Sequence, residues 1–445
     1  MAAAARPLPP TTVTPHGGRD AAPTAAPRCP DVDPADHAHR RRHGRGFWAV
    51  AFAFAAIMAL STVPSPLYPL YVARDGLSPL TITLVYAAYA IGVVGSLFLA
   101  GHVSDWHGRR RVLLPALATA ALSAGVFLAW TDLWALFLGR VLNGIAIGAV
   151  TATATAYLAE LHARHRPDAS AARAQLVATA ANLGGIGLGP LVSGALAQGV
   201  GAPLDVPYAV ALAALLLGAV AVAVSPETRE RPVPRPRYRA QRVAVPRAAR
   251  GRFFAAALGA LLAFATLGLF TGLASTILTG TMHRTSPLLA GASIFVAFAA
   301  GVAAQLGTGR WGLRRTLGVG MALIAIGLAV LVLAVWLPTP SLTLFLLGGA
   351  VAGAGSGALF KGTLGTVVGL ATDDGRAEAL AGLFLAGYVG LSVPVVGVGL
   401  ALQGTSTRVA LLGFAVLVVG AVLAAAPTLL GRPGRPASAA PPEAV

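Results

Sequence analysis

Apolar runs long enough to cross a membrane, separated by short polar segments, recur along the chain from Phe47 onward. A transmembrane α-helix needs roughly 20 mainly apolar residues, and inside lipid a helix satisfies its own backbone hydrogen bonds. The pattern therefore predicts twelve transmembrane helices. We expect the first six at 47–72, 80–101, 112–130, 133–159, 174–200 and 206–224. We expect the second six at 253–279, 288–307, 316–337, 341–370, 378–403 and 408–430.

Polar segments at both ends and in the middle divide the chain into two membrane domains. Residues 1–46 are rich in Ala, Pro, His and Arg, and are predicted to form a disordered cytoplasmic tail. A six-helix bundle at 47–225 is followed by a linker at 226–252, which carries nine arginines between Arg229 and Arg252. A second bundle at 253–430 precedes a short cytoplasmic tail at 431–445. The predicted fold class is an all-α integral membrane protein of two pseudo-symmetric six-helix bundles.

Basic residues alternate between the segments that connect the helices. The tails and alternate connections hold 28 of the 33 Lys and Arg residues, whereas the intervening connections hold only Arg74, Arg284 and Arg408. Positively charged segments stay cytoplasmic during insertion, so both termini are predicted to be cytoplasmic, with the protein in the cell membrane. This distribution explains the formal charge of +17 without a nucleic-acid partner, because the excess basic residues lie where anionic lipid headgroups attract them.

The composition argues against enzymatic chemistry. Hydrophobic residues make up 56% of the chain and charged residues 11%, and the single cysteine is Cys29 in the polar tail. Metalloprotease and serine-hydrolase motifs are absent from the sequence. We expect neither a catalytic residue, nor a metal, nor a cofactor.

The two halves resemble each other in sequence. Aligning 136–138 with 344–346, both Leu-Phe-Leu, sets one glycine- and alanine-rich stretch against another. The basic segment 108–111 likewise corresponds to 312–315 at the equivalent place in the second half. Internal repeats of this kind are typical of secondary transporters, in which the solute binds between them.

The segment 101–111 is a short charged turn between two apolar helices. Gly101 and Gly108 permit a tight reversal, Asp105 can lie near a helix N-terminus, and Arg109 and Arg110 can pair with carboxylates or headgroups. A simple positive-inside topology signal would require the arginines, but it would not require the spaced Gly, Asp and Gly. The G-x-x-x-D-x-x-G-R-R pattern resembles the signature of the major facilitator superfamily between its helices 2 and 3. The resemblance implies a cytoplasmic gate that latches the two halves together; in the second half, Gly309 replaces the aspartate.

The fourth predicted helix carries Arg140, Asn143 and Gly144, which resemble the R-x-x-Q-G element of the same family with Asn in place of Gln. An arginine inside a membrane helix is costly, which makes it a candidate functional residue. The alternative is that its side chain reaches the outer interface, because it lies only about two turns from the helix start.

The fifth predicted helix carries Gly185, Gly189, Pro190 and Gly194, which resemble the G-x-x-x-G-P-x-x-G-G element of drug:proton antiporters, with Ser193 in place of one glycine. The glycines let another helix approach closely and the proline permits a kink. An ordinary packing helix is the alternative.

Glu160 and Arg166 after the fourth helix, with Glu227 after the sixth, resemble the cytoplasmic charge network of sugar porters. The spacing from Glu160 to Arg166 is one residue shorter than in that family. We interpret these residues as partners of the basic turn, and therefore as part of the gate.

Family resemblance places the central cavity along helices 1, 4, 7 and 10. The candidate cavity residues there are Ser65, Tyr68, Asn143, Ser275, Thr276 and Lys361, among further polar groups at Ser61, Thr62 and Thr271. For Lys361, a substrate or coupling role and snorkelling to the interface are both open. None of the predicted helices has a carboxylate in its central part, which leaves the coupling ion open.

The sequence therefore predicts a secondary transporter that works as a monomer. The first hypothesis is export of small amphipathic or drug-like compounds, with proton antiport as the coupling to test. The second is uptake of a sugar or another metabolite, and a non-transporting membrane sensor is the third.

Overall fold

The computed structural model describes residues 34–100, 107–229, 249–371 and 375–431, nearly all of them helical. Within these ranges, twelve helical segments are long and apolar enough to cross a membrane. The predicted all-α architecture of twelve transmembrane helices is confirmed, and most helix ends lie within three residues of their predicted positions. Gly101 and Asp105 lie outside the described residues, as do 1–33, 230–248 and 432–445.

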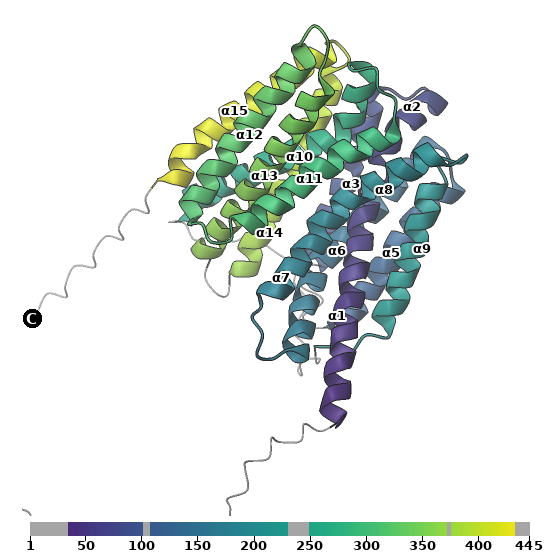
Figure 1. The fold of residues 1–445 in the computed structure, drawn as a ribbon, viewed down its shortest axis with the longest axis vertical. Coiled ribbons are helices and arrows are strands. Elements are labelled where there is room, and N and C mark those ends of the chain that lie inside the picture. The colour runs from purple at the N-terminus through teal and green to yellow at the C-terminus, as the bar shows by residue number, and fades with distance from the viewer. Residues whose placement is uncertain (1–33, 101–106, 230–248, 372–374, 432–445) are drawn as a thin grey trace, which may run out of the picture.

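Six spans form each half of the molecule (Figure 1). The first half contains α1 (Pro34–Leu60), η1 (Ser65–Leu67), α2 (Tyr68–Asp75), α3 (Pro79–Ala100), α5 (Arg109–Ala129), α6 (Leu133–His165), α7 (Ala172–Thr179), η2 (Ala180–Gly184), α8 (Gly185–Gly199) and α9 (Val206–Ala223). The second half contains α10 (Arg250–Gly280), α11 (Pro287–Gly307), α12 (Leu313–Trp336), α13 (Leu342–Leu370), α14 (Arg376–Ala401) and α15 (Thr407–Leu430).

The first span is both longer and more broken than a simple apolar run predicts. Because α1 begins at Pro34, the prediction of a disordered tail up to residue 46 was wrong for 34–46. This extension packs on the end of α6, where Nδ1 of His165 lies 2.8 Å from the backbone oxygen of Arg40. At its other end the span is interrupted between Leu60 and Ser65, and it continues through η1 and α2 to Asp75.

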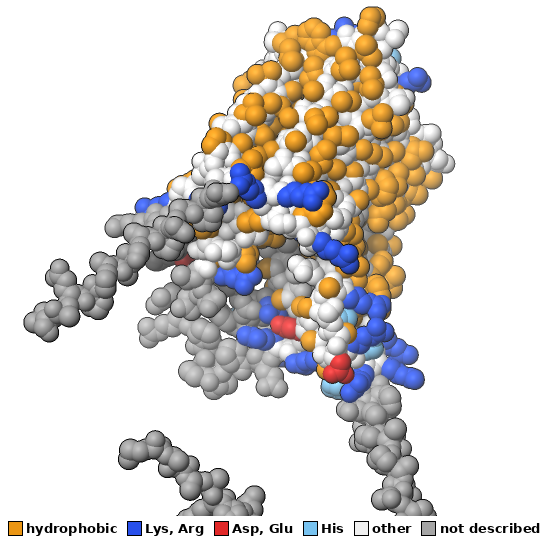
Figure 2. Space-filling model, turned by 60° about the vertical axis from the view of Figure 1, so that its left-hand side comes forward, with side chains coloured by type: hydrophobic (Ala, Val, Ile, Leu, Met, Phe, Trp, Pro, Cys, Tyr) orange, Lys and Arg blue, Asp and Glu red, His pale blue; other side chains and the backbone are white. Residues whose placement is uncertain are grey.

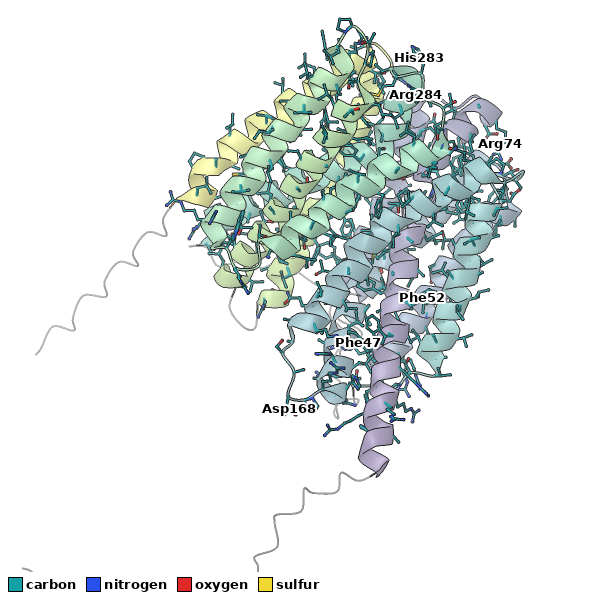
Figure 3. The ribbon with its side chains drawn as sticks, viewed as in Figure 1. Phe47, Phe52, Arg74, Asp168, His283 and Arg284 are labelled. Carbon is teal, nitrogen blue, oxygen red and sulfur yellow. The ribbon has the colours of Figure 1, made fainter. Side chains whose placement is uncertain are left out.

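The chain ends define the two sides of the molecule. The start of α1 and the end of α15 lie on one side, here called the terminal side, and Arg74 and Arg284 lie on the opposite, far side (Figures 1 and 3). Arginine side chains gather on the terminal side, below a surface rich in hydrophobic side chains (Figure 2). An apolar belt with basic residues at one edge is the surface expected for a protein embedded in a bilayer.

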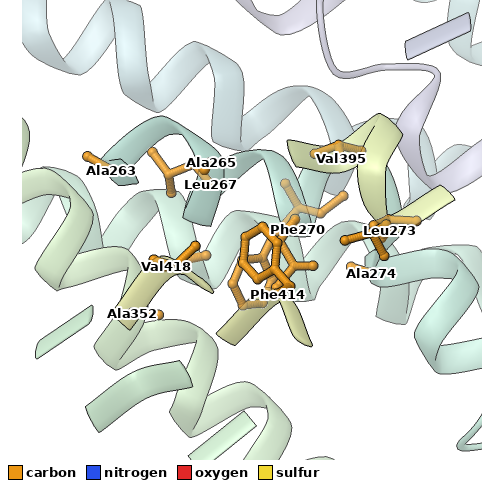
Figure 4. Packing of buried hydrophobic residues seen from close by; sticks show 14 of the residues in the cluster. Ala263, Ala265, Leu267, Phe270, Leu273, Ala274, Ala352, Val395, Phe414 and Val418 are labelled. Atoms are coloured by element: carbon orange, nitrogen blue, oxygen red, sulfur yellow. The ribbon is translucent and has the colours of Figure 1, made fainter. Parts of the chain in front are cut away.

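Two clusters of buried apolar side chains form the hydrophobic cores of the molecule. One contains mainly first-half residues. The other fills the second half, where Phe270, Phe414 and Val418 pack together (Figure 4), and it continues into the far-side ends of the first half through Leu67, Tyr71 and similar residues. The halves therefore share a hydrophobic core at the far side, and they diverge toward the terminal side (Figure 1).

Candidate functional site

A cavity of about 80 Å³ lies between the two halves. Its walls come from both halves, including α3, α6 and η2 of the first and α10, α13 and α14 of the second. Most of the lining is apolar or aromatic. The polar side chains among the lining residues are Ser61, Thr62, Tyr86, Tyr89, Arg140, Thr151, Asn182, Thr271, Gln305, Ser356 and Tyr388.

The second half contributes an aromatic wall to this cavity. Ring centroids lie 5.9 Å apart for Tyr388 and Phe264, 5.1 Å for Phe264 and Phe360, and 6.1 Å for Phe360 and Phe384. Tyr388 is also 6.3 Å from the ring of Tyr89 in the first half. Edge-to-face and tilted pairs at these separations are favourable, so the aromatic wall is a continuous apolar surface across the interface.

Arg140 is the only charged residue among the described residues that line the cavity, and its side chain is buried. Its guanidinium donates to the backbone carbonyls of Ser61 and Tyr86, at 2.5 and 3.4 Å. It also lies over two aromatic rings, 5.3 Å from the centroid of Tyr86 and 5.0 Å from that of Tyr89. Of the two roles left open by the sequence, the geometry favours a cavity residue over one that reaches the membrane interface.

The hydrogen bond from Arg140 to Ser61 is one of three in which a side chain donates to a backbone carbonyl at the break after α1. Proline lacks a backbone N–H, so Pro69 leaves the carbonyl of Ser65 without its helical donor. Ser275 of α10 donates to that carbonyl at 3.0 Å, across the interface between the halves. Ser193 of α8 donates to the carbonyl of Val63 at 2.7 Å. The break is thus stabilised by side chains from three other helices.

A second freed carbonyl lies in α8. Pro190 cannot donate to Ile186, and the hydroxyl of Thr62 donates to that oxygen instead, at 2.7 Å. Ser193, which departs from the antiporter-like glycine pattern, is explained by its bond to Val63. Side chains of the first span and of α8 therefore each donate to a backbone carbonyl of the other.

The glycines of the helix 5 motif make close contacts on two faces of α8. A Cβ atom on Gly185 would lie 2.7 Å from the backbone oxygen of Ala55, and one on Gly189 would lie 2.2 Å from that of Ala59. On the other face, a Cβ atom on Gly194 would lie 2.3 Å from the backbone oxygen of Pro287 in the second half. The motif therefore packs α8 between α1 of its own half and α11 of the other.

Gly144 of the helix 4 motif brings α6 against α3. A Cβ atom at Gly144 would lie 2.1 Å from the backbone oxygen of Tyr89. Since Tyr89 and Arg140 lie on these two helices, the close crossing places the guanidinium over the tyrosine rings. The motif thus positions the cavity residues as well as packing the helices.

Charged residues form a network on the terminal side, within the first half. Arg109 of α5 pairs with Glu160 of α6, with 2.9 Å between Nη2 and Oε1. The carboxylate of Glu227 accepts from the backbone N–H groups of Arg109 and Arg110, at 2.9 and 3.1 Å, and so caps the N-terminus of α5. Gly108 adopts φ +99°, and a Cβ atom there would lie 2.7 Å from Oε2 of Glu227.

The structure thus brings together Gly108, Arg109, Arg110, Glu160 and Glu227, as the sequence predicted for the gate. Arg166 is exposed at the end of α6, and the described contacts of the network do not include its side chain. Gly101 and Asp105 fall outside the described residues. Whether this network latches the two halves stays a prediction.

The cavity lining differs from the predicted set. Ser65, Tyr68, Asn143 and Ser275 are buried, but they are not among the lining residues, and neither are Thr276 and Lys361. Ser65 and Ser275 instead contact each other where the halves close at the far side. The polar groups of the first and seventh spans that do line the cavity are Ser61, Thr62 and Thr271.

Lys361 caps the end of α11. Its ammonium group donates to the backbone carbonyl of Gln305 at 2.5 Å and lies 3.3 Å from the hydroxyl of Thr308. The last carbonyls of a helix have no internal donor, and a cation there also interacts favourably with the helix dipole. This geometry favours the snorkelling alternative over direct contact with a solute.

Several lining residues carry no sequence motif. Tyr86, Tyr89, Phe264, Phe384 and Tyr388 read as ordinary apolar positions of membrane helices. Asn182 lies in the π-helical turn η2, which re-aims the side chains of the fifth span. Of these residues, Asn182 alone could have been noticed in the sequence, because its amide interrupts an apolar run. For metal binding, the described residues offer no group of three or more His, Cys, Asp or Glu.

Comparison with known proteins identifies the family. The model of the Major Facilitator Superfamily matches residues 50–310. The fold is similar to that of the nucleoside transporter NupG, with a TM-score of 0.65 and 14% identity over 86% of this chain and 99% of that one.

Sequence relatives match over shorter segments. A 145-residue segment is 30% identical to an uncharacterized MFS-type transporter, YfkF of Bacillus subtilis, covering 31% of this chain and 36% of that protein. Segments of 80 and 84 residues are 36% and 33% identical to a triacylglyceride transporter of Mycobacteroides abscessus and to the arabinose-proton symporter of Bacillus subtilis. They cover 18% and 19% of this chain, and 16% and 18% of those proteins. The chain spans about a third or less of the length of these curated relatives.

These features define a multi-pass membrane protein with a cavity between its two halves. The chain belongs to the Major Facilitator Superfamily.

Proposed function

We propose that this protein is a secondary active transporter that exports small amphipathic compounds by alternating access. The observation that carries the proposal is the cavity between the halves, which combines a continuous aromatic wall with polar side chains that come mainly from the first half. A mostly apolar binding surface suits amphipathic solutes better than sugars, which need many hydrogen-bonding partners. The antiporter-like glycines of α8, packed against both halves, support the same direction of transport.

The proposed topology has both termini in the cytoplasm and the protein in the cell membrane. The arginines on the terminal side support it, because basic segments remain cytoplasmic. In this orientation, the far-side closure at Ser65 and Ser275 seals the cavity from the outside. The structure then corresponds to an inward-facing state of a protein that works as a monomer.

Uptake of a sugar or another metabolite is the second candidate. The observation in its favour is the network of Arg109, Glu160 and Glu227, which resembles the cytoplasmic network of sugar porters. One of the relatives is an arabinose-proton symporter. The network lies outside the cavity, and it therefore supports a mechanism of gating more than a choice of solute.

Transport in proteoliposomes separates these candidates. Purified protein is reconstituted, and a panel of amphipathic dyes and sugars is measured with and without an imposed pH gradient. Gradient-driven dye movement supports proton-coupled export, and dye movement without the gradient supports export with another coupling. Sugar counterflow in the absence of dye transport would replace export with the second candidate. No movement of any solute would contradict both.

A further inference from the structure

Arg140 is a buried cation without an anionic partner among the described residues. The described acidic residues lie in connecting segments or near helix ends. Glu160, on the same helix, is twenty residues away, which is roughly 30 Å along the helix axis. Among the described residues, the charge of Arg140 is therefore compensated only by carbonyl dipoles and by tyrosine rings.

This compensation is incomplete. Removing an ion from water costs several kcal/mol even after the protein relaxes, and an unpaired charge recovers only part of that cost. The Nε atom of Arg140 is buried and has no hydrogen-bond partner in the structure. Because Arg140 lines the cavity, a bound solute can supply the missing interactions of its side chain.

A second buried polar group lies beside it. Asn143 follows Arg140 by three residues, so the two side chains share a face of α6. Only 1% of Asn143 is exposed, and neither its side-chain nitrogen nor its oxygen has a partner. Two adjacent buried polar side chains without partners are costly. Of the two, Arg140 lines the cavity and is the one that a bound solute can contact.

The opposite side of the cavity has a different character. The aromatic wall of Phe264, Phe360, Phe384 and Tyr388 presents rings without any ionised group. A solute that spans the cavity therefore meets a cation on the first half and the aromatic wall on the second, where Thr271, Gln305 and Ser356 add neutral polar groups. A cationic solute would meet only repulsion from Arg140.

We infer that the cavity selects amphipathic organic anions, whose compact anionic group binds Arg140 while the apolar body lies on the aromatic wall. A carboxylate or sulfonate matches the planar donor geometry of arginine, and charge-assisted hydrogen bonds are the strong ones. This inference rests on the proposed export function, because it names the solute class that the same cavity takes.

The test compares three probes that share one ring system. The full chain is placed in nanodiscs of neutral phosphatidylcholine, and the binding of 2-naphthoate, 2-naphthamide and 2-naphthylmethylammonium is measured by equilibrium dialysis. We expect the carboxylate to bind at least tenfold more tightly than the amide and the cation. Equal binding of the three probes, or binding of none, would overturn the inference without any variant.

Variants then locate the preference. Arg140→Gln is expected to abolish the preference, so that this variant binds naphthoate no more tightly than it binds the amide. Arg284→Gln removes a charge from an exposed far-side position and is expected to keep the preference. An Arg140→Gln protein that still prefers the carboxylate would contradict the inference, and would leave Arg140 only its contacts with Ser61 and Tyr86.

Transport distinguishes this inference from the proposed function. Proteoliposomes that export neutral and anionic amphiphiles equally well would contradict the anion preference and retain the exporter. Selective binding of naphthoate without transport of any solute would retain the anion site and contradict the exporter.

Discussion

The hydroxyl of Ser275 in the second half donates a hydrogen bond to the carbonyl of Ser65 in the first, across 210 residues of chain. The acceptor is free because residue 69 is a proline, so a local feature of the first span creates a contact between the halves. The contact lies where the halves share their hydrophobic core. It joins the two halves at the far side, where they must separate if the cavity is to open on that side.

Closure of the far side can be tested with cysteines at Gln198 of α8 and Ser286 before α11, whose side chains contact each other across the interface. In a Cys29→Ser background, we expect a short bis-methanethiosulfonate reagent, which forms a disulfide with each thiol, to join Gln198→Cys to Ser286→Cys and to abolish transport. Reduction should restore it. Cross-linking Ser286→Cys to Leu289→Cys, both in the second half, should leave transport intact. Full transport by the cross-linked first pair would contradict alternating access at this interface.

Thr62 donates to the carbonyl that Pro190 leaves without a helical donor, so substitutions of these two residues should have non-additive effects on the free energy of unfolding. Thr62→Val leaves the carbonyl of Ile186 without a donor, which should cost about 1–3 kcal/mol in the free energy of unfolding. Pro190→Ala restores the backbone N–H that α8 lacks. In the double variant, we expect the loss from Thr62→Val to shrink by at least half. Thermal unfolding in detergent measures all four proteins, and additive losses would contradict this account.

Gly144→Ala should prevent the close crossing of α6 and α3. Its Cβ atom would lie 2.1 Å from the backbone oxygen of Tyr89, so the helices must separate. We expect a loss of more than about 2 kcal/mol in the free energy of unfolding, in the range of overpacked cores. Gly125→Ala is the matched control, because a Cβ atom there meets nothing within 4 Å, and helix propensity should make it neutral or slightly stabilising. Similar unfolding temperatures for the two variants would refute the role of Gly144.

The charge network on the terminal side should contribute to stability through Arg109 and Glu160. Because the arginine is mostly buried, Glu160→Gln removes a counter-charge from beside it, and we expect a cost above the roughly 0–1 kcal/mol of an exposed pair. Arg173→Gln, at an exposed position of α7, is the control. A double-mutant cycle with Arg109→Gln measures the coupling. A coupling energy near zero would mean that the ion pair does not stabilise this arrangement.

Lys361 is expected to act on stability more than on transport. Lys361→Met removes the cation from the end of α11, and should lower the free energy of unfolding by about 1–2 kcal/mol. Lys361→Arg keeps a cationic donor and should retain most of the stability. Transport per folded molecule should remain close to that of the unchanged protein in both variants. A large loss of transport in a stable Lys361→Met protein would reinstate a role in coupling or solute binding.

The sequence predicts the fold well because a bilayer permits few solutions. Each span must be apolar for about 20 residues and must satisfy its own backbone, so hydropathy alone locates the helices. The error at 34–46 has a physical cause. The polar residues there offer no apolar run, and the helix persists because it continues α1 and packs on His165 of α6.

The site is less predictable because it depends on how distant helices are rotated against each other. The terminal-side network could be predicted, since Arg109, Glu160 and Glu227 lie at helix ends whose positions follow from topology. The cavity lining could not. Ser275 and Thr271 lie four residues apart on α10, yet one closes the far side and the other lines the cavity.

Arg140 also bears on how the chain is made. Within the part of the chain that the structure describes, its guanidinium donates to Ser61 and Tyr86 and lies over the rings of Tyr86 and Tyr89, and all three residues precede it in the sequence and belong to the first half. During synthesis, the nascent chain therefore already holds the partners of its membrane arginine when that residue leaves the ribosome. The first six spans can insert into lipid before the aromatic wall exists, and the second half completes the cavity around a charge that is already in place.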